Sequence, residues 1–344
     1  MISSFLVIMV TLAGAFFSKK NKNNPGKTLR IGFYNVENLF DPYDDPKTND
    51  DQFTPSNIKG WSNERYQRKC LLLSKTIIAM GIKGPPDFLG LAEIENKKVL
   101  TDLIYSTPLL NWDMDIIHED SPDERGIDVA AVYNRNFLSV INYGYSKVRF
   151  RSDKRPTRKI LCACLKTNNN DTIYILVNHW PSRFGGQLES EDGRIDASNT
   201  LINILDSLNS LKANPHIIIM GDFNDNPSDR SILMLTEKKF TTLYGRKTFI
   251  VNLSESIDYS GTLKFNAVWF TFDQILISDN LLPNPGKSCY IAYVNARVFH
   301  PDFLLCQDEN YTGLKPFRTF SGSRYLGGFS DHLPICIDVV LVDR

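Results

Sequence analysis

Gly327-Gly328-Phe329-Ser330-Asp331-His332-Leu333-Pro334-Ile335, close to the C-terminus, is the stretch that best indicates the fold and chemistry of this chain. An acid and an imidazole precede an apolar run, Ile335–Val342, that has the composition of a strand. Such groups are costly to place at the mouth of a buried strand unless they have partners. The stretch therefore predicts a polar site at one rim of a sheet.

Further short polar clusters stand beside apolar runs elsewhere in the chain. They are Asn35-Val36-Glu37, Glu93-Ile94-Glu95, His179-Trp180-Pro181-Ser182 and Asp222-Phe223-Asn224-Asp225. Alternate residues of a strand share a face, so paired polar residues in these clusters are expected to point the same way. Each cluster alone is also compatible with a solvated strand end. Together, carboxylate, amide and imidazole groups suit a hard divalent cation and a phosphate ester.

The two histidines in these clusters need partners that orient their rings. Asp273 opens an otherwise apolar strand and is the candidate partner of His332, while Asp128 is a candidate partner of His179. The remaining histidines have no such context and are interpreted as surface or structural residues: His118, His216 and His300.

Composition sets wider bounds. The 344 residues are 42% hydrophobic, enough for one large α/β or layered domain or for two smaller ones. The 39 basic and 39 acidic residues cancel, which weakens a DNA-binding hypothesis without excluding it. The densest basic run could track a phosphate backbone or could be a solvated hairpin. Its members are Arg149, Arg151, Lys154, Arg155, Arg158 and Lys159. The six cysteines lack zinc-finger spacing and are expected to be free, mostly buried thiols.

The N-terminus reads as a separate segment. An apolar run at Phe5–Phe17 is followed by Lys19 and Lys20, and Ala13-Gly14-Ala15 resembles a small-residue cleavage site. We therefore predict a signal peptide and linker over residues 1–27, a domain over 28–344, and a secreted or periplasmic protein. A membrane anchor formed by residues 5–17 and a misassigned start are the alternatives.

Periodicity predicts many strands and few helices. Helices are expected over Asn63–Met80 with Ser62 as N-cap, Lys97–Tyr105, Asp196–Leu211, and Asp229–Glu237 with Ser228 as N-cap. Strands are expected over Leu29–Asn35, Phe88–Ala92, Ile127–Tyr133, Ser139–Arg149, Ile160–Lys166, Thr172–His179, Ile217–Gly221 and Phe272–Ser278. This pattern favours two packed sheets flanked by helices.

The order of the motifs resembles the endonuclease/exonuclease/phosphatase superfamily. They run Asn-Val-Glu, Ala-Glu-Ile-Glu, Asn-His-Trp-Pro-Ser, Gly-Asp-Phe-Asn-Asp, Phe-Asp-Gln-Ile-Leu and Ser-Asp-His-Leu-Pro, across about residues 29–342. The resemblance implies an α/β, deoxyribonuclease I-like fold: a four-layered sandwich of two mixed β-sheets flanked by helices. It also implies phosphoester hydrolysis that depends on Mg²⁺ or Mn²⁺.

The resemblance also assigns roles by motif. Asn35, Glu93 and Asp331 would surround the metal, with Glu37 bound directly or through water. Asp222 would orient or deprotonate the attacking water, Asn224 and His179 would contact the phosphate, and Asp273 would orient His332. Ser182, Arg183, Arg158 and Asp128 are the expected substrate contacts. Two departures stand out: Ala92 replaces the family's usual Gln, and Glu37 stands where many members carry Asp.

These observations predict a metal-dependent phosphodiesterase, specifically an exported, monomeric endonuclease that cleaves nucleic acid, DNA more than RNA, without an obligate protein partner. The Pro-Ser-Trp-x-Asp-Arg pattern of inositol 5-phosphatases does not occur, since Arg183-Phe184-Gly185-Gly186 follows Ser182. A phosphatase or a sphingomyelinase-like phospholipid phosphodiesterase is the alternative. A catalytically silent binding protein on the same fold is the more distant one.

Overall fold

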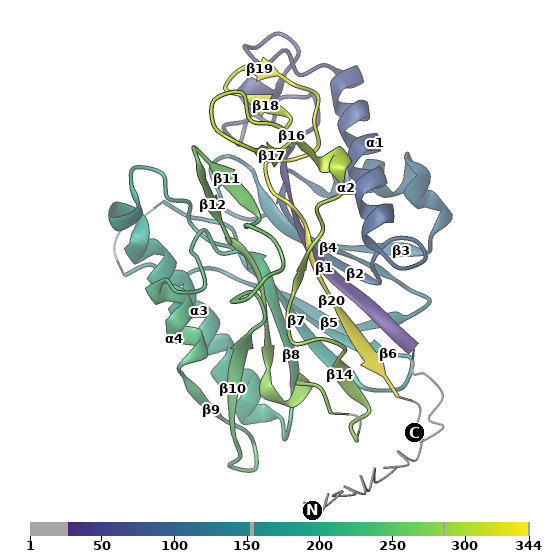
Figure 1. The fold of residues 1–344 in the computed structure, drawn as a ribbon, viewed down its shortest axis with the longest axis vertical. Helices are drawn as coiled ribbons and strands as arrows, with labels where there is room; N and C mark the ends of the chain where they lie inside the picture. The colour runs from purple at the N-terminus through teal and green to yellow at the C-terminus, as the bar shows by residue number, and fades with distance from the viewer. Residues whose placement is uncertain (1–26, 152–154, 285, 343–344) are drawn as a thin grey trace, which may run out of the picture.

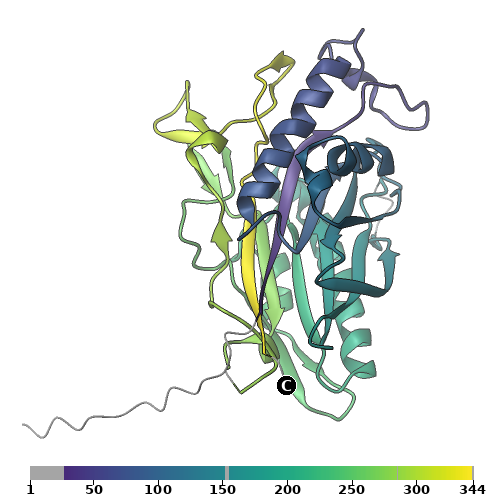
Figure 2. The same cartoon turned by 90° about the vertical axis from the view of Figure 1, so that its right-hand side faces the viewer.

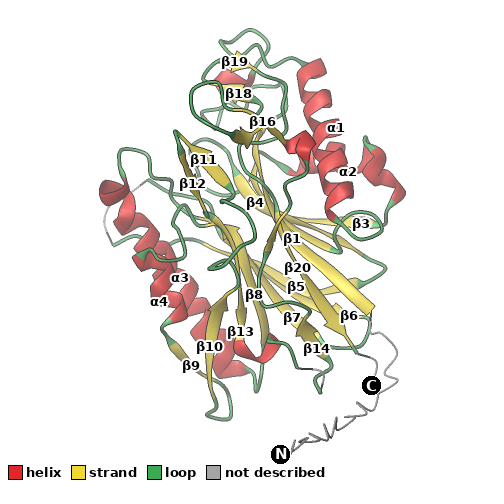
Figure 3. Ribbon diagram, in the orientation of Figure 1, coloured by secondary structure: helices red, strands yellow, loops and turns green. Residues whose placement is uncertain are grey.

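The computed structural model describes residues 27–151, 155–284 and 286–342. Two mixed, seven-stranded sheets pack face to face, and helices cover their outer faces (Figures 1 and 3). This is the predicted four-layered arrangement. The predicted signal peptide and anchor lie outside the described residues. Within the described ranges, no helix has the length and apolar character needed to cross a membrane.

The first sheet places the N-terminal and C-terminal long strands side by side. In spatial order it contains β14 (Cys289–Ile291), β20 (Ile335–Leu341), β1 (Lys27–Leu39), β2 (Phe88–Ile94), β4 (Asp128–Asn134) and β3 (Met114–His118), with β15 (Arg297–Val298) also paired to β20. Strands β1 and β2 are parallel, whereas β1 and β20 are antiparallel. The start of β20 therefore lies at the same rim as the ends of β1 and β2.

The second sheet is built in a similar way. Its order is β5 (Leu138–Ser146), β6 (Ile160–Thr167), β7 (Thr172–His179), β8 (His216–Asp222), β13 (Asp273–Ser278), β10 (Lys247–Asn252) and β9 (Lys239–Thr241). Strands β7 and β8 are parallel, and β13 runs antiparallel to β8. The ends of β7 and β8 and the start of β13 consequently meet at one edge.

Hydrophobic residues fill all three spaces between the layers. The largest cluster lies between the sheets and includes Phe33, Val177 and Ile275. A second cluster packs the helices α1 (Asn63–Met80) and α2 (Lys97–Tyr105) against the first sheet. A third packs α3 (Gln187–Leu211) and α4 (Arg230–Thr236) against the second sheet. Figure 1 shows these helix pairs on opposite sides of the sandwich.

Small hairpins rise from one end of the strands. They are β11 (Leu263–Phe265) with β12 (Val268–Phe270), β16 (Leu305–Gln307) with β17 (Leu314–Pro316), and β18 (Phe320–Ser321) with β19 (Arg324–Tyr325). Figures 1 and 2 both place β16–β19 at the end away from the C-terminus. Short 3-10 turns occupy Asp51–Phe53, Pro108–Asn111, Asp279–Leu281 and Asp302–Leu304.

The bounds of the predicted helices are largely confirmed, with two corrections. Helices α1 and α2 have the predicted bounds, and the Ser62 hydroxyl accepts a hydrogen bond from Arg65 N at 3.3 Å. Helix α3 begins at Gln187 rather than Asp196, because its polar first turns have no apolar periodicity to reveal them. The N-cap of α4 is Asp229, so Ser228 was the wrong residue.

Candidate active site

The predicted polar clusters gather at one rim of the sandwich. Asp222, at the end of β8, is the register partner of His179 on β7 and of Asp273 on β13. Asn35 on β1 reaches across from the other sheet, and its amide nitrogen donates to Asp222 Oδ2 at 3.0 Å. His332 enters from the segment that precedes β20. Both sheets thus contribute to a single buried cluster.

The His332 imidazole is held between two carboxylates. Its Nδ1 lies 2.7 Å from Asp273 Oδ2, and its Nε2 lies 3.8 Å from Asp222 Oδ2. Burial alone would lower the pKa of His332, but Asp273 and Asp222 outweigh burial and raise it well above its usual value. Burial also raises the pKa of Asp222, against the opposing effect of the His332 charge. The contact with Asp273 that was predicted to orient the His332 ring is therefore observed.

The backbone departs from regular strand geometry where the polar side chains project. Glu37, Asn38, Glu93 and Asn224 all have positive φ, between 51° and 64°. This region is unfavourable for residues other than glycine and is typical of constrained functional sites. These positive φ values interrupt the alternation of side chains between the two faces of a strand that was expected within each motif. Glu95, for example, turns away and accepts Asp41 N at 2.6 Å, so it does not share the Glu93 site.

Glu93 is well placed as a cation ligand. Its Oε2 accepts Asn38 N at 2.8 Å, while its Oε1 has only a long 3.4 Å contact from the Asn35 amide. The side-chain Oδ1 of Asn35 accepts Glu37 N at 3.0 Å, which fixes the orientation of the amide. One carboxylate oxygen of Glu93 therefore keeps spare acceptor capacity beside Asn35 and Asp222.

Glu37 and Asp331 belong to a neighbouring acidic group that two cations partly neutralise. Glu37 Oε2 accepts Thr319 N at 2.6 Å, and Arg318 lies 2.9 Å from Asp331 Oδ2 and 3.5 Å from Glu37 Oε1. Burial raises the pKa of Glu37, and Asp331 adds to that effect against the two cations. Both carboxylate oxygens of Glu37 thus accept backbone N–H groups, those of Thr319 and Phe320.

The second of these cations, Lys69, was missed from the sequence. Its side chain is only 1% exposed and donates to Thr319 Oγ1 and Phe329 O, each at 2.5 Å. Burial lowers the pKa of Lys69, although Glu37 opposes this. The signal in the sequence was a lysine on the apolar stripe of helix α1, between Tyr66 and Leu73.

His179 reaches the cluster without the partner that was predicted for it. Its Nε2 lies 3.6 Å from Asp222 Oδ2, and its buried Nδ1 has no hydrogen-bond partner among the described residues. Asp128 instead meets His118 Nε2 at 2.9 Å and accepts Ser121 N, so the proposed Asp128–His179 pair is wrong. Burial, followed by the charge of Arg158, lowers the pKa of His179 well below its usual value.

The basic run is mostly neutralised by acidic partners. Arg158 is 5% exposed, lies 3.1 Å from Asp123 and donates to Trp180 O, so its placement in an exposed basic run is wrong. The other paired members are Arg151 with Asp192 and Asp196, Arg155 with Glu124, and Lys159 with Glu119. Lys154 lies outside the described residues. These four paired residues therefore offer little uncompensated positive charge to a phosphate backbone.

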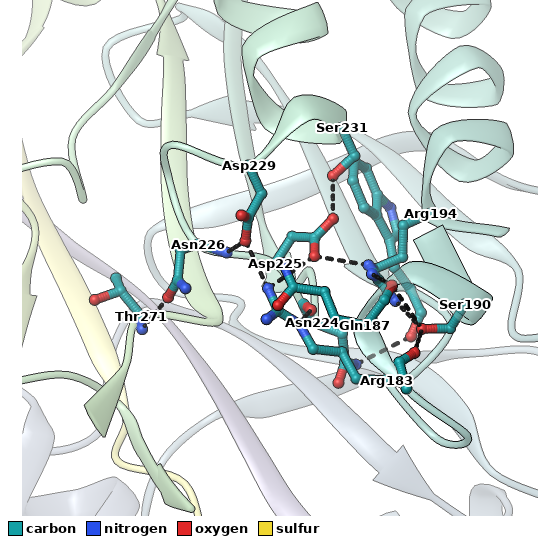
Figure 4. Close-up of polar contacts among 12 residues, drawn as sticks. Arg183, Gln187, Ser190, Arg194, Asn224, Asp225, Asn226, Asp229, Ser231 and Thr271 are labelled. Atoms are coloured by element: carbon teal, nitrogen blue, oxygen red, sulfur yellow. Dashed lines mark hydrogen bonds and ion pairs between the residues drawn. The ribbon is translucent and has the colours of Figure 1, made fainter. Parts of the chain in front are cut away.

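Arg183 supports the Asp222–Asn224 loop instead of standing free for substrate. It donates to Asn224 O at 2.8 Å and to Asp225 at 2.9 Å, and its guanidinium also meets Asp229. Asp225 in turn contacts buried Arg194 at 2.7 Å and accepts the Ser231 hydroxyl at 2.6 Å. Figure 4 shows Asp225 surrounded by these partners. The network ties the Asp222–Asn224 loop to helices α3 and α4, and Arg194 and Asp225 were not predicted as parts of it.

Asn224 and Ser182 lie on the loops that follow β8 and β7. The Asn224 side-chain amide donates to Trp180 O at 3.1 Å, and its backbone N donates to Asp222 Oδ1 at 3.0 Å. This fixes the amide beside Asp222 and leaves it a second N–H. Ser182 is exposed on the loop after β7. Of the other histidines, His300 stacks on Tyr259 at 4.0 Å, away from these contacts.

The donor set fits a hard divalent cation. Carboxylate and amide oxygens are the ligands that Mg²⁺ and Mn²⁺ prefer. Glu93 has an oxygen with spare acceptor capacity beside the Asn35 amide, and the charges of Asp331, Glu37 and Glu93 all act on Arg318. The accumulation of carboxylates near Lys69 and Arg318 marks a region of excess negative charge, which a further cation would relieve.

Comparisons with known proteins agree with this geometry. A sequence model described as Endonuclease/Exonuclease/phosphatase family matches residues 30–340. No functionally curated sequence matches significantly. Similar solved structures include a mannosyl-6-phosphatase of Bacteroides thetaiotaomicron, with a TM-score of 0.57 and 16% identity over 91% of this chain and 100% of that one.

Two further structures extend the comparison. The human nocturnin catalytic domain with bound sulfate has a TM-score of 0.55 and 16% identity, over 92% of this chain and 94% of that one. TDP2 of D. rerio, complexed with single-strand DNA product, has a TM-score of 0.52 and 13% identity, over 91% and 98%. At these identities the likeness concerns the fold, which is deoxyribonuclease I-like. The family match covers most of the chain, and the protein therefore belongs to the endonuclease/exonuclease/phosphatase family.

Proposed function

We propose that this protein is a Mg²⁺- or Mn²⁺-dependent hydrolase of phosphate esters. The observation that carries the proposal is the buried arrangement in which Asp273 holds His332 beside Asp222, with Asn35 joining Asp222 to Glu93. Family membership supports phosphoester hydrolysis in general. A structural role alone would not require so many polar groups on strained backbone at one rim.

Each group has a part in hydrolysis that its position permits. Asp222 would orient the attacking water and receive its proton, because its carboxylate lies at the centre of the cluster. His332, His179 and the free N–H of Asn224 would contact the phosphoryl oxygens. Glu93, Asn35 and Asp331 would hold the metal, with Glu37 supporting them. When bound, the metal offsets the negative charge of the phosphoryl group.

The charge distribution favours a compact ester over a long polymer. A nuclease gains much of its affinity from basic groups that replace counterions on the phosphate backbone. In the basic run, Arg151, Arg155 and Lys159 already face carboxylates. We therefore infer that the substrate is a small phosphate ester, as in a phosphatase.

The endonuclease predicted from the sequence is the second candidate. Phe184, on the loop that follows β7, is 93% exposed and could stack on a base. The fold does not distinguish between the two candidate substrates, since it occurs both in a mannosyl-6-phosphatase and in a protein solved with a DNA product.

A substrate panel tests both candidates. Purified protein is assayed with p-nitrophenyl phosphate, bis-p-nitrophenyl phosphate and plasmid DNA, each with Mg²⁺, Mn²⁺ or EDTA. We expect metal-dependent turnover of the small esters and weak or no cutting of DNA. Efficient DNA cleavage that falls steeply with salt would replace the compact-ester assignment with the endonuclease. An absence of turnover for every ester would reject both.

A further inference from the structure

The loop between β3 and β4, residues 119–127, brings an exposed cation to the rim that carries the candidate site. Strand β4 begins at Asp128, and the register partner of Asp128 is Ile94, the residue after Glu93. Arg125 lies three positions before Asp128, so it enters β4 at the edge of the sheet where Glu93 lies. The Arg125 side chain is 48% exposed, which leaves its guanidinium accessible to a ligand.

A series of contacts also joins Arg125 to the second sheet. The Arg125 Nε lies 3.7 Å from Asp123 Oδ1, and Asp123 Oδ2 lies 3.1 Å from Arg158 Nη1. Arg158 in turn donates through its Nη2 to the backbone oxygen of Trp180, the residue after His179. Arg125 is thus connected through two side chains to the strand end that carries His179, which was predicted to contact the phosphate.

The charges around Arg125 do not balance. Two guanidinium groups, those of Arg125 and Arg158, share the single carboxylate of Asp123. Arg158 makes the shorter contact and is buried, so it is the main partner of Asp123. The neighbouring Glu124 pairs with Arg155 instead. Within the described ranges, no other carboxylate forms an ion pair with Arg125, so one exposed positive charge remains at this point of the rim.

This charge acts on the imidazole that is expected to meet the phosphate. Burial and the charge of Arg158 lower the pKa of His179, and the charge of Arg125 adds to that effect. His179 is therefore neutral at neutral pH, and a neutral imidazole offers an N–H group to a phosphoryl oxygen but no charge. Beside His179, the exposed positive charge that a phosphoryl group can meet is that of Arg125.

The backbone of this loop is held in place on both sides of Arg125. Before it, Glu124 O accepts Asn49 N at 2.7 Å. After it, Gly126 has a φ of 68°, and a Cβ atom at this position would lie 2.8 Å from Thr48 Cγ2. Glycine alone tolerates both the positive φ and the close approach. The base of the Arg125 side chain is therefore positioned before a ligand binds, which lowers the entropic cost of binding.

We propose that Arg125 binds a terminal oxygen of the substrate phosphoryl group and thereby selects phosphate monoesters over diesters. The inference rests on the proposed function and names its substrate class. A monoester has three terminal oxygens and two negative charges on its phosphoryl group, whereas a diester has two terminal oxygens and one charge. A guanidinium beside the phosphoryl group therefore favours the monoester, through the additional charge and through the additional oxygen that accepts its N–H groups.

Each terminal oxygen of a monoester then has a partner. Asn224 and His179 offer N–H groups on one side, Glu93 would hold the metal on another, and Arg125 meets the oxygen that remains. In a diester, an uncharged alcohol group replaces that oxygen and faces the guanidinium. Hydrolysis of the monoester joins a water oxygen to phosphorus and breaks the bond between phosphorus and the alcohol oxygen. The alcohol oxygen takes up one proton of the water, so that an alcohol and inorganic phosphate leave.

The test compares a monoester and a diester that share one leaving group, p-nitrophenyl phosphate and bis-p-nitrophenyl phosphate. The wild-type protein should prefer the monoester by about tenfold or more in kcat/KM, as expected for one additional charge-assisted contact. Arg125→Gln should lower kcat/KM for the monoester by about 10- to 100-fold and for the diester by less than about threefold. Arg125→Lys keeps the charge without the planar fork and should recover part of the loss.

Arg135→Gln is the matched control, because Arg135 is also an exposed arginine beside β4 but follows the opposite end of that strand, where it pairs with Asp113. It should leave both activities unchanged. A loss in Arg125→Gln that is equal for the two substrates, or larger for the diester, would overturn the inference. So would a wild-type protein that hydrolyses the diester as efficiently as the monoester.

A calorimetric titration separates failure of the inference from failure of the proposed function. If no ester is turned over, the proposed function fails, but binding of inorganic phosphate and of dimethyl phosphate can still be measured with Mg²⁺ present. Binding of inorganic phosphate that is about tenfold weaker in Arg125→Gln, with unchanged binding of dimethyl phosphate, would support the role of Arg125 on its own. An absence of phosphate binding to the wild type, or equal binding by both proteins, would reject it.

Discussion

His332 Nδ1 and Asp273 Oδ2 lie 2.7 Å apart although the two residues are separated by 59 positions in the chain. The pair is buried, and it joins the segment before β20 to the start of β13, so it connects the two sheets as well as orienting the imidazole. The other ring nitrogen is then directed towards Asp222. A ring fixed in this way suits the role that we propose for His332 in hydrolysis.

Asp273 and His332 should act as one unit. His332→Ala should lower kcat by about 10²-fold or more, because it removes a group that acts on the phosphate. Asp273→Asn should cause a smaller loss, and the double variant should lose little beyond His332→Ala. Steady-state kinetics on p-nitrophenyl phosphate measures this, with His300→Ala as the control that keeps full activity. Multiplicative losses would show that the two residues act independently.

Arg318 should oppose metal binding. It lies beside both Asp331 and Glu37, so its charge competes electrostatically with a cation at the same carboxylates. Arg318→Gln should tighten Mn²⁺ binding by about three- to tenfold, since a nearby like charge is removed. Calorimetric titration with Mn²⁺ measures the change. Arg324→Gln, which removes an exposed ion pair with Glu309, should leave the affinity unchanged. Weaker binding to Arg318→Gln would contradict this prediction.

Asp225 should matter for stability as well as activity. Asp225→Asn would leave the fully buried guanidinium of Arg194 without its charged partner, which typically costs about 3–5 kcal/mol. Urea unfolding measures the loss in the free energy of unfolding. Asp206→Asn, which removes a solvent-exposed pair with Lys238, should cost less than about 1 kcal/mol. Equal effects of the two substitutions would show that the network of Figure 4 does not anchor the loop.

Asp87 should make stability depend on pH. Burial raises the pKa of Asp87 to about 6 from its usual 3.8. Between pH 3.8 and about pH 6, the folded state therefore binds more protons than the unfolded state. The contribution of Asp87 to stability is complete below pH 3.8 and is lost as pH rises to about 6. Asp87→Asn keeps an acceptor for Arg30 N but no longer titrates. The decrease in the free energy of unfolding between acidic and neutral pH should therefore be smaller by about 1–2 kcal/mol, a value that allows for the partial exposure of Asp87. Urea unfolding at pH 4 and pH 7 tests this, with exposed Asp302→Asn as the control. Parallel pH profiles for wild type and Asp87→Asn would contradict it.

Local periodicity predicted the architecture because the elements that build it are long. The apolar stripe of α1 and the continuous apolar run of β8 could be recognised without tertiary context. The short strands β14 and β15 could not, since two or three residues carry no measurable period and are set by pairing with β20. The polar start of α3 was missed for a related reason: Arg194 is buried against Asp225, a contact between distant segments.

The residues of the site likewise fall into those that the sequence could place together and those that it could not. Asp222, Asp273 and His332 could be placed together because each borders an apolar run: Asp222 ends β8, Asp273 begins β13, and His332 precedes β20. The partner of His179 could not be chosen from the sequence, and Asp128 faces His118 across the β3–β4 pair instead. A charge run likewise does not reveal its partners: Arg158 belongs to the basic run but is buried against Asp123. The roles of Lys69 and Arg318 could not be predicted, because their acidic partners, Glu37 and Asp331, are distant in the sequence or not recognisable as partners from it.

The most direct test of the central claim is the metal dependence of p-nitrophenyl phosphate hydrolysis by the wild type and by Glu93→Gln. The substitution keeps the shape of the side chain and removes the charge that would hold the cation. We predict that wild-type turnover requires Mg²⁺ or Mn²⁺ and is lost with EDTA, and that Glu93→Gln lowers kcat/KM by about 10²-fold or more. Wild-type turnover that persists in EDTA, or a fully active Glu93→Gln protein, would contradict the account.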